Sequence, residues 1–343
     1  MTDHGQVPSP PPQQSPGVSI VVPVLNEERF LVAAVTRLLE QAYDGPLEVI
    51  LALGPSQDHT DEIALGLADS DARVHLVRNP SGRTPVGLNA AIARARYDVI
   101  VRCDGHALVP LDYVAAAVET LIRTGADNVG GIMAAEGVTP FEQAVARSMT
   151  STLGVGGASF HTGGDEGPAP TVYLGAFTRA ALERVGGYDE SMQRAQDWEL
   201  NLRLRQTGGT VWFTPRMQVT YRPRGSVRSL ARQYFDYGRW RREVVRRHPD
   251  TVSARYLAAP VAVVGVTFGA AAGLIATMGG PGWLAVGWLA PVGYAALIGV
   301  GSVVVGRGLS GPAWLRLPLA LATMHASWGL GFLTSTRAIA ARS

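Results

Sequence analysis

The chain has 343 residues, of which 47% are hydrophobic and 17% charged, and its 30 cationic side chains are all arginine. This composition excludes a disordered or fibrous protein, and the single cysteine, Cys103, excludes an intramolecular disulfide and a thiolate zinc cluster. Residues 1–215 carry 25 acidic side chains and 15 arginines, residues 216–255 carry 3 and 11, and residues 256–343 carry none and 4. We therefore expect an acidic soluble head, a basic collar and a membrane tail.

The head is expected to follow a proline-rich tail. Residues 1–16 contain five prolines and lack the apolar run of a signal peptide, so they are predicted to be disordered. Beyond them strands are expected at 18–25, 47–53, 74–78 and 97–103, and helices at 27–42, 60–67, 84–95 and 111–124. This alternation predicts a Rossmann-like α/β domain whose largely parallel sheet is covered by helices on both faces. Asn26 is predicted to cap the first helix, and Asp58 or Thr60 the second.

The alternation changes after a strand expected at 128–134. Helices are expected at 140–151 and 197–206, and two short strands are expected around Trp212 and Val219. Between the two helices lies a glycine-rich loop, 154–168, that contains His161. A loop of this length in a compact domain is either functional or mobile.

The C-terminal part reads as a membrane domain. Residues 256–306 contain no charged side chain, and a Gly-Gly-Pro-Gly turn at 279–282 divides them into two runs, each long enough to cross a hydrocarbon core of about 30 Å. The run 317–334 contains His325 and is shorter, so it either spans or re-enters; two spans are favoured over three. The arginine-rich collar belongs inside, which predicts a multi-pass protein of the cell membrane with a cytoplasmic head. The expected boundaries are a tail at 1–16, a head at 17–225, an interfacial segment at 226–255 and a membrane domain at 256–343.

Polar residues follow the predicted parallel strands at the edge where such sheets bind ligands. They are Pro23, Asn26 and Glu27 after the first strand, Ser56 and Asp58 after the second, and Arg102, Asp104 and His106 after the fourth. An acid at this edge can hold a divalent cation that neutralises a phosphate leaving group. His106 would be a further ligand, which Mn²⁺ accepts more readily than Mg²⁺. The alternative is that Asp104-Gly105 is a tight turn with a solvated carboxylate.

Asp197 and the basic collar can each be interpreted in two ways. Asp197 is either a helix N-cap or a general base whose charged form the helix N-terminus favours. In the collar, apolar side chains recur every three or four residues over 227–244 with arginines on the flanks. That pattern predicts an amphipathic interfacial helix attracted to anionic lipid, and an arginine there can also contact a pyrophosphate.

Taken together, these motifs resemble the family 2 glycosyltransferases of the GT-A fold. The opening VSIVVPVLNEE, the loop Gly54–Thr60 and the Arg102–His106 run match the family's first strand, nucleotide loop and metal position. The segment from Gly175 to Glu190 resembles the acceptor side, and Gln196–Glu199 occupies the catalytic position. The resemblance covers roughly residues 18–250, and the nearest likeness is to membrane-anchored enzymes that extend succinoglycan-type exopolysaccharide repeat units on a lipid carrier.

The sequence departs from the family pattern in three ways. Leu53 and Gly54 stand where the family often has acids that recognise the nucleobase, and His106 stands where a second Asp is common. Gln196 replaces the Glu beside the expected base. The run 236–240 keeps the Arg-Trp of the processive enzymes' Gln-x-x-Arg-Trp motif without its Gln, which argues against a processive, pore-forming synthase.

The resemblance implies an inverting, metal-dependent enzyme that moves one sugar from a nucleotide-sugar, with a UDP-sugar favoured, to a saccharide on a polyprenyl diphosphate. Membrane lipid is an expected partner and nucleic acid is not. Asp197 would be the general base, and Asp104 with His106 would hold Mn²⁺ or Mg²⁺. The donor would be bound by Pro23, Asn26, Glu27, Ser56, Asp58, Arg102, Asp104, Arg239 and Trp240.

Two rival functions stay open at this point. One is a polyprenyl-phosphate sugar synthase, whose acceptor is a phosphate that needs no general base. The other is a non-catalytic sugar-nucleotide-binding scaffold in the membrane, suggested by the altered Leu53-Gly54 and Gln196. Retention of both Asp104 and Asp197 favours an enzyme over a scaffold.

Overall fold

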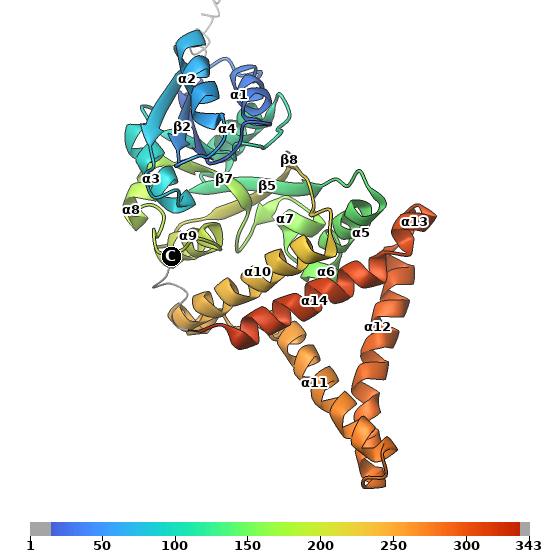
Figure 1. Cartoon of the computed structure of the whole chain (residues 1–343). Helices are drawn as coiled ribbons and strands as arrows, with labels where there is room; N and C mark the ends of the chain where they lie inside the picture. The colour runs from blue at the N-terminus through green and yellow to red at the C-terminus, as the bar shows by residue number, and fades with distance from the viewer. Residues whose placement is uncertain (1–14, 337–343) are drawn as a thin grey trace, which may run out of the picture.

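The computed structural model describes residues 15–336, so most of the predicted tail lies outside the described residues. Its sheet has eight strands in the order β3-β2-β1-β4-β7-β5-β8-β6 (Figure 1). The parallel half consists of β1 (Val18–Val24), β2 (Leu47–Leu53), β3 (Val74–Arg78) and β4 (Val99–Arg102). All four strands were predicted, and their β-branched, apolar sequences suit strands that are buried on both faces.

The other half of the sheet is mixed. It contains β5 (Asn128–Ala135), β6 (Gly167–Pro168), β7 (Tyr173–Thr178) and β8 (Val211–Tyr221). Strand β7, which the sequence did not predict, runs antiparallel to both β4 and β5, whereas β8 runs parallel to β5. The two short strands predicted around Trp212 and Val219 are one strand, β8, whose pairing with β5 shifts between Gly130 and Ile132.

Helices cover both faces of the sheet. They are α1 (Leu31–Leu39), α2 (Thr60–Ser70), α3 (Thr84–Arg94), α4 (Tyr113–Thr124), α5 (Pro140–Met149), α6 (Thr152–Val155), α7 (Ser159–Thr162), α8 (Arg179–Val185) and α9 (Gln196–Gln206). Alternate side chains of β1 enter opposite cores: Val18, Ile20 and Val22 pack in the cluster that includes α1 and α4, and Val21 packs in the cluster that includes α3 and α9. This alternation fixes the register of the strand, because a slip of one residue would exchange its two faces.

The predicted cap of the first helix is wrong. Helix α1 begins at Leu31, and its N-cap position is Phe30 without a side-chain hydrogen bond. Asn26 instead adopts a left-handed backbone conformation with φ 56°, which asparagine tolerates better than most residues. Helix α2 begins at Thr60, whose backbone N–H donates to Asp58 Oδ1 at 3.1 Å, so Asp58 does support the start of this helix.

Below the head, α10 (Val227–Arg247) and α14 (Leu317–Thr334) lie side by side (Figure 1). Glycines allow the two backbones to touch: a Cβ on Gly238 would overlap the Trp328 carbonyl, and one on Gly331 would overlap the Phe235 carbonyl. The segment 317–334 therefore forms a layer with the amphipathic helix. It is not one of the two helices long and apolar enough to cross a membrane.

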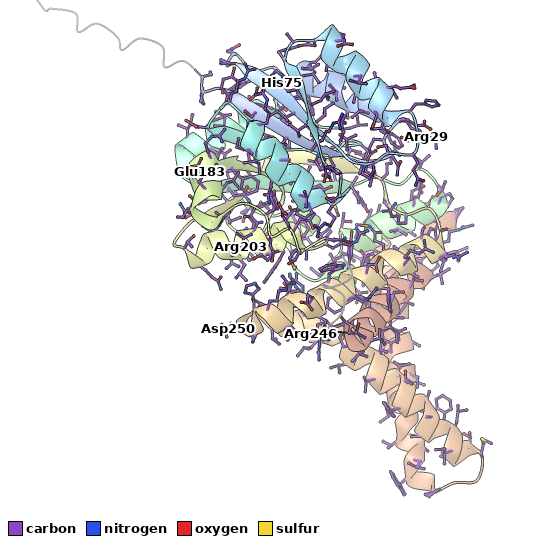
Figure 2. The ribbon with its side chains drawn as sticks, turned by 60° about the vertical axis from the view of Figure 1, so that its left-hand side comes forward. Arg29, His75, Glu183, Arg203, Arg246 and Asp250 are labelled. Atoms are coloured by element: carbon purple, nitrogen blue, oxygen red, sulfur yellow. The ribbon has the colours of Figure 1, made fainter. Side chains whose placement is uncertain are left out.

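Those two helices form a hairpin that projects away from the head (Figure 1). They are α11 (Ala254–Thr277) and a continuous helical segment, Gly282–Val305, made of η2 (Gly282–Trp288) and α12 (Leu289–Val305). Only 11% of each apolar window is buried, whereas the core helix of a soluble protein would be mostly buried. Short connections η1 (Pro249–Thr251) and α13 (Gly311–Trp314) join the hairpin to its neighbours. Figure 2 shows the labelled charged residues, Arg203 and Arg246 among them, on the head and collar and none on the hairpin.

Candidate active site

Hydrogen bonds join the loops after β1 and β2 into one unit. The Asn26 backbone N–H donates to Ser56 Oγ at 3.1 Å, and the Gln57 N–H donates to Asn26 Oδ1 at 2.8 Å. The Glu27 N–H donates to Thr60 Oγ1 at 2.7 Å. Three residues predicted to bind the donor, Asn26, Glu27 and Ser56, are thereby held together at the carboxyl edge of the sheet.

Asp58, at the same edge, is occupied by its own loop. Its carboxylate accepts hydrogen bonds from the Thr60 hydroxyl and backbone N–H and from the Glu28 N–H. The hydrogen bond from the Thr60 hydroxyl is the main cause that lowers the pKa of Asp58, so this side chain is ionised at neutral pH. The contacts assign Asp58 a role in shaping the loop, and its contact with a donor stays a prediction.

Arg102 brings together two acidic side chains from distant parts of the chain. It is the last residue of β4, is only 4% exposed, and donates from Nη2 to Asp104 Oδ1 at 3.1 Å. Its Nη1 donates to Asp197 Oδ1. In the described part of the chain, the second carboxylate oxygen of each aspartate has no hydrogen-bond partner. Both remaining oxygens are therefore available to ligands.

Asp197 is not the N-cap of its helix. Helix α9 begins at Gln196, its N-cap position is Ala195, and no side chain caps it. Burial raises the pKa of Asp197, the charge of Asp104 adds to this rise and Arg102 opposes it. The carboxylate is therefore more basic than an ordinary aspartate, which suits a proton acceptor.

His106 and Glu27 form a second pair beside Asp104. His106 Nδ1 lies 2.7 Å from Glu27 Oε1, and this hydrogen bond raises the pKa of His106. A Cβ on Gly105 would lie 3.1 Å from Glu27 Cγ, and 3.6 Å from the carbonyl oxygen of Pro23, so glycine permits the close approach of this turn to β1. His106 Nε2 has no partner in residues 15–336 and is the nitrogen left for a ligand.

Within the described chain, no three His, Cys, Asp or Glu side chains converge on a metal position. Asp104, with one free oxygen, and His106, with one free nitrogen, fit a cation that takes its other ligands from substrate phosphate and water. Mg²⁺ is often bound in this way, through one or two carboxylates and a substrate phosphate. The residues present therefore fit a divalent cation that binds together with a diphosphate.

Trp240 and Arg239 do not contact this acidic pair among the residues described. Trp240 is 6% exposed and packs with Met192 and Val244 in a small cluster against which Ala195 and Trp198 are packed. It therefore packs against the start of α9, the helix that carries Asp197. The Arg239 guanidinium lies 5.8 Å from the centre of the Phe235 ring, and its Nη1 lies 3.8 Å from Asp236.

Tyr188 was placed only within the segment that resembles the acceptor side, and no role was predicted for Arg203; in the structure Tyr188 lies near Asp197, and Arg203 lies on the same helix as Asp197. Tyr188 is 3% exposed, and burial, followed by the charge of Asp197, raises the pKa of its hydroxyl. Arg203 on α9, labelled in Figure 2, donates to the backbone carbonyls of Val185 and Gly187 and fastens this loop to the helix. The Gly-Gly-Tyr sequence at 186–188 was a usable signal, because both glycines have a positive φ.

Comparison with known proteins agrees with this arrangement. Residues 19–186 match the family described as Glycosyl transferase family 2. The succinoglycan biosynthesis protein ExoA of Rhizobium meliloti is 34% identical over 317 residues, which cover 91% of this chain and 93% of that protein. A dolichyl N-acetyl-alpha-D-glucosaminyl phosphate 3-beta-D-2,3-diacetamido-2,3-dideoxy-beta-D-glucuronosyltransferase of Methanococcus voltae is 25% identical over 246 residues, covering 67% and 74% of the two chains.

A solved structure shares the fold. The mannosyltransferase PcManGT from Pyrobaculum calidifontis, in complex with GDP-Man and Mn²⁺, superimposes with a TM-score of 0.57 and 22% identity over 94% of this chain and 89% of that one. The strand order, the paired acids at the sheet edge and the long match to ExoA agree with one another. The chain belongs to the family 2 glycosyltransferases, and it is a glycosyltransferase with a GT-A fold.

Proposed function

We propose that this enzyme transfers a single sugar, with inversion, from a nucleotide-sugar to a lipid-linked saccharide at the cytoplasmic face of the membrane. The observation that carries the proposal is the contact of Arg102 with both Asp104 and Asp197, in a head that stands on a two-helix apolar hairpin. One acid faces the expected diphosphate and the other is a basic carboxylate beside it. This is the arrangement that a displacement at an anomeric carbon requires.

Asp197 acts as the general base. Its Oδ1 is held by Arg102, which leaves Oδ2 to accept the proton of an acceptor hydroxyl. As that proton leaves, the hydroxyl oxygen bonds to the anomeric carbon from the face opposite the diphosphate. The bond from carbon to the diphosphate breaks, the nucleoside diphosphate departs with the electron pair, and the configuration inverts. Arg102 stays between the two acids and fixes their separation.

Asp104 and His106 hold the divalent cation, Mn²⁺ or Mg²⁺, at the donor diphosphate. When bound, the cation stabilises the negative charge that develops on the leaving group. The presence of GDP-Man and Mn²⁺ in the structural neighbour supports a nucleotide-sugar donor and a metal. The sequence favours a UDP-sugar as the donor. A panel of nucleotide-sugars would determine the base of the nucleotide.

The names of the relatives support a lipid-linked acceptor in glycan synthesis. One is a succinoglycan biosynthesis protein, and the name of another places its acceptor sugar on a dolichyl phosphate. The membrane hairpin would keep the head where such acceptors lie. The positive-inside rule assigns the arginine-rich α10, and the head with it, to the cytoplasmic side.

A panel of nucleotide-sugars tests the proposal. The purified full-length protein in detergent would be incubated with each radiolabelled donor, a membrane lipid extract and Mn²⁺, and label in the lipid phase would be counted. We expect one donor to label lipid, and EDTA to abolish the transfer. Transfer that leaves the configuration of the anomeric carbon unchanged, or that proceeds fully in EDTA, would contradict the mechanism.

A further inference from the structure

Four side chains form a row between the head and the first helix of the hairpin. The Arg241 guanidinium on α10 lies 4.4 Å from the centre of the Trp198 ring and 4.1 Å from that of Tyr256. The guanidinium of Arg255 lies 4.8 Å from the centre of the same Tyr256 ring. Trp198 directly follows the proposed base, and Arg255 is in the first turn of the helix that enters the membrane. The row therefore connects the active site to the membrane boundary.

Arg241 is a partly buried cation that contacts no acidic side chain in the described part of the chain. Other arginines near the end of α10 pair with acids: Arg246 with Glu243, and Arg247 with both Glu243 and Asp189. Arg241 has no ion pair in the described part of the chain, and its Nη1 is buried without a hydrogen-bond partner. Burial lowers the pKa of Arg241 to about 10, with a smaller contribution from the charge of Arg255, whereas Tyr256 opposes the shift. The two aromatic rings stabilise the charge but accept no hydrogen bond from the buried Nη1, so an anion that accepts from this atom would be stabilised here.

The glycine-rich loop brings a third group to the row. A Cβ on Gly156 would overlap the side chain of Arg255, so the loop approaches this arginine closely only because residue 156 is glycine. His161, on α7 in the same loop, has a buried Nδ1 without a partner among residues 15–336. Burial lowers the pKa of His161 to about 4, and Arg255 contributes to that shift. The imidazole is neutral at physiological pH, and one of its nitrogens can donate a hydrogen bond to an anion.

We infer that Arg241, Arg255 and His161 bind the phosphate-bearing head of the lipid carrier, which places the attached saccharide beside Asp197. This inference rests on the proposed function and names the acceptor subsite. Two guanidinium groups offer the charge and the paired donors that a diphosphate needs. The position of Arg255 at the start of a membrane-spanning helix favours a phosphate carried on a lipid. The donor diphosphate has its own place at Asp104 and His106.

Lipid binding by the full-length protein tests the subsite directly. Native mass spectrometry in detergent would be used to titrate wild type, Arg241→Gln and Arg255→Gln with polyprenyl diphosphate. Arg232→Gln is the matched control, because it removes the same charge from an exposed position of the same helix. We expect each of the first two changes to weaken binding by roughly tenfold or more, the effect of losing one charge-assisted hydrogen bond, and the control to leave it unchanged. Equal binding in all four proteins would overturn the inference.

Two competing ligands identify the source of the phosphate. Phosphatidylglycerol and inorganic pyrophosphate would each be titrated against bound polyprenyl diphosphate. We expect both to compete weakly. If phosphatidylglycerol displaced polyprenyl diphosphate at equal concentration, the row would be a general site for lipid headgroups. If pyrophosphate displaced it at equal concentration, the lipid part of the ligand would have no role in binding. Either result refutes the assignment. Arg241→Lys keeps the charge without the planar pair of donors and should bind with intermediate affinity, which separates binding from loss of folding.

Kinetics separate this inference from the function on which it rests. Slow hydrolysis of the nucleotide-sugar by water needs no acceptor, and the control Arg232→Gln should retain it at the wild-type rate. In transfer to lipid, Arg241→Gln should raise KM for the acceptor with little change in kcat. If wild type turns over no nucleotide-sugar, the proposed function fails. If transfer occurs and the KM for the lipid is the same in wild type, Arg241→Gln and Arg255→Gln, the proposed function stands and only the phosphate subsite is refuted.

Discussion

The charge balance at Arg102 determines what the site can do. One guanidinium at the end of β4 is shared by two aspartates, and each aspartate keeps one oxygen for other partners. Because Arg102 is almost fully buried, it cannot exchange these partners for water. The separation of the two acids is therefore set by the folded protein before any substrate arrives.

Replacement of Asp197, the proposed general base, is the first test of a single residue. Asp197→Asn keeps the size of the side chain and an acceptor for Arg102, so folding and donor affinity should change little. Turnover should fall by about 10²- to 10⁴-fold, because the proton of the acceptor hydroxyl then has no acceptor. The measurement is initial-rate transfer together with nucleotide affinity, and Asp61→Asn, an exposed acid-to-amide change on α2, is the control. Near-wild-type transfer to a hydroxyl acceptor would remove Asp197 from the mechanism, and a small loss would favour a phosphate acceptor.

The pH dependence follows from the same carboxylate. Burial raises the pKa of Asp197, and only the ionised form accepts a proton. Activity should therefore fall as the pH falls through this raised pKa, at a pH above the ordinary aspartate value of about 3.9. The acid limb of kcat/KM for the wild type measures it, and the limb should be absent from the residual activity of Asp197→Asn. A wild-type profile that stays flat down to pH 4 would contradict the assignment.

Replacements of the two proposed metal ligands, Asp104 and His106, should have different effects on activity. Asp104→Asn weakens the one carboxylate ligand, so nearly all turnover should be lost while the fold is retained, as judged by circular dichroism. His106→Ala should be milder and should move the preference between Mn²⁺ and Mg²⁺, because imidazole is a better ligand for Mn²⁺. Both effects are measured as transfer rates across a series of divalent cations added back after treatment with EDTA. Full activity of Asp104→Asn without metal would exclude this metal site.

At the scale of elements, the close crossing of α10 and α14 has a strict packing requirement. Gly238 and Gly331 each face a backbone carbonyl of the opposite helix, so neither position has room for a Cβ. Contacts this close increase van der Waals attraction between the two helices. The crossing holds α14 against the head, where it covers α5 and α10.

Gly238→Leu should separate the two helices. Overpacking in a dense core typically costs about 1–3 kcal/mol, and here the neighbour is backbone that cannot change rotamer. We expect a lower Tm in detergent and reduced activity. Gly299→Leu on α12, where an added Cβ meets nothing within 4 Å, is the matched control and should melt with the wild type. Equal Tm values for both variants would show that the crossing does not limit stability.

The elements also show which parts of the fold were accessible from sequence. Strands β2 and β3 begin and end where their apolar runs predicted, because a buried parallel strand is specified by its own composition. Strand β7 was missed, since its sequence Tyr-Leu-Gly-Ala-Phe-Thr follows a glycine-rich loop and its pairing partners β4 and β5 are distant in the chain. Asp104 and Asp197 were identified from their positions, but their link through Arg102 required the tertiary fold. The role of Arg241 was equally hidden, because its missing anion shows only once its neighbours are known.

At the scale of the molecule, the hairpin and the basic helix define an orientation. The head, α10 and both ends of the hairpin lie on one side, and the turn at 279–282 lies at the far tip (Figure 1). Apolar side chains along α11 and α12 face outward, Val261, Phe268, Val292 and Val300 among them. We expect lipid to cover these side chains.

Cysteine labelling tests this orientation. The natural thiol, Cys103, is fully buried, and burial raises its pKa, so it contributes little background. Gly282→Cys at the tip should react with a membrane-impermeant maleimide in intact cells. Asp250→Cys in the collar should react only after permeabilisation. The reverse pattern would place the head outside, and labelling of both positions in intact cells would exclude a spanning hairpin.

The cluster that joins α5 and α10 to α14 also determines when the protein can finish folding. Its members Met149 and Leu230 precede the hairpin in the chain, whereas Leu321 and Met324 follow it. During synthesis the ribosome must therefore complete the hairpin before α14 emerges to cover the apolar side of the head. At about 5–20 residues per second, that delay lasts several seconds, during which the underside of the head is exposed. Burial of this surface is therefore completed only after the hairpin has been synthesised, so the head reaches its final packing after the membrane segment exists.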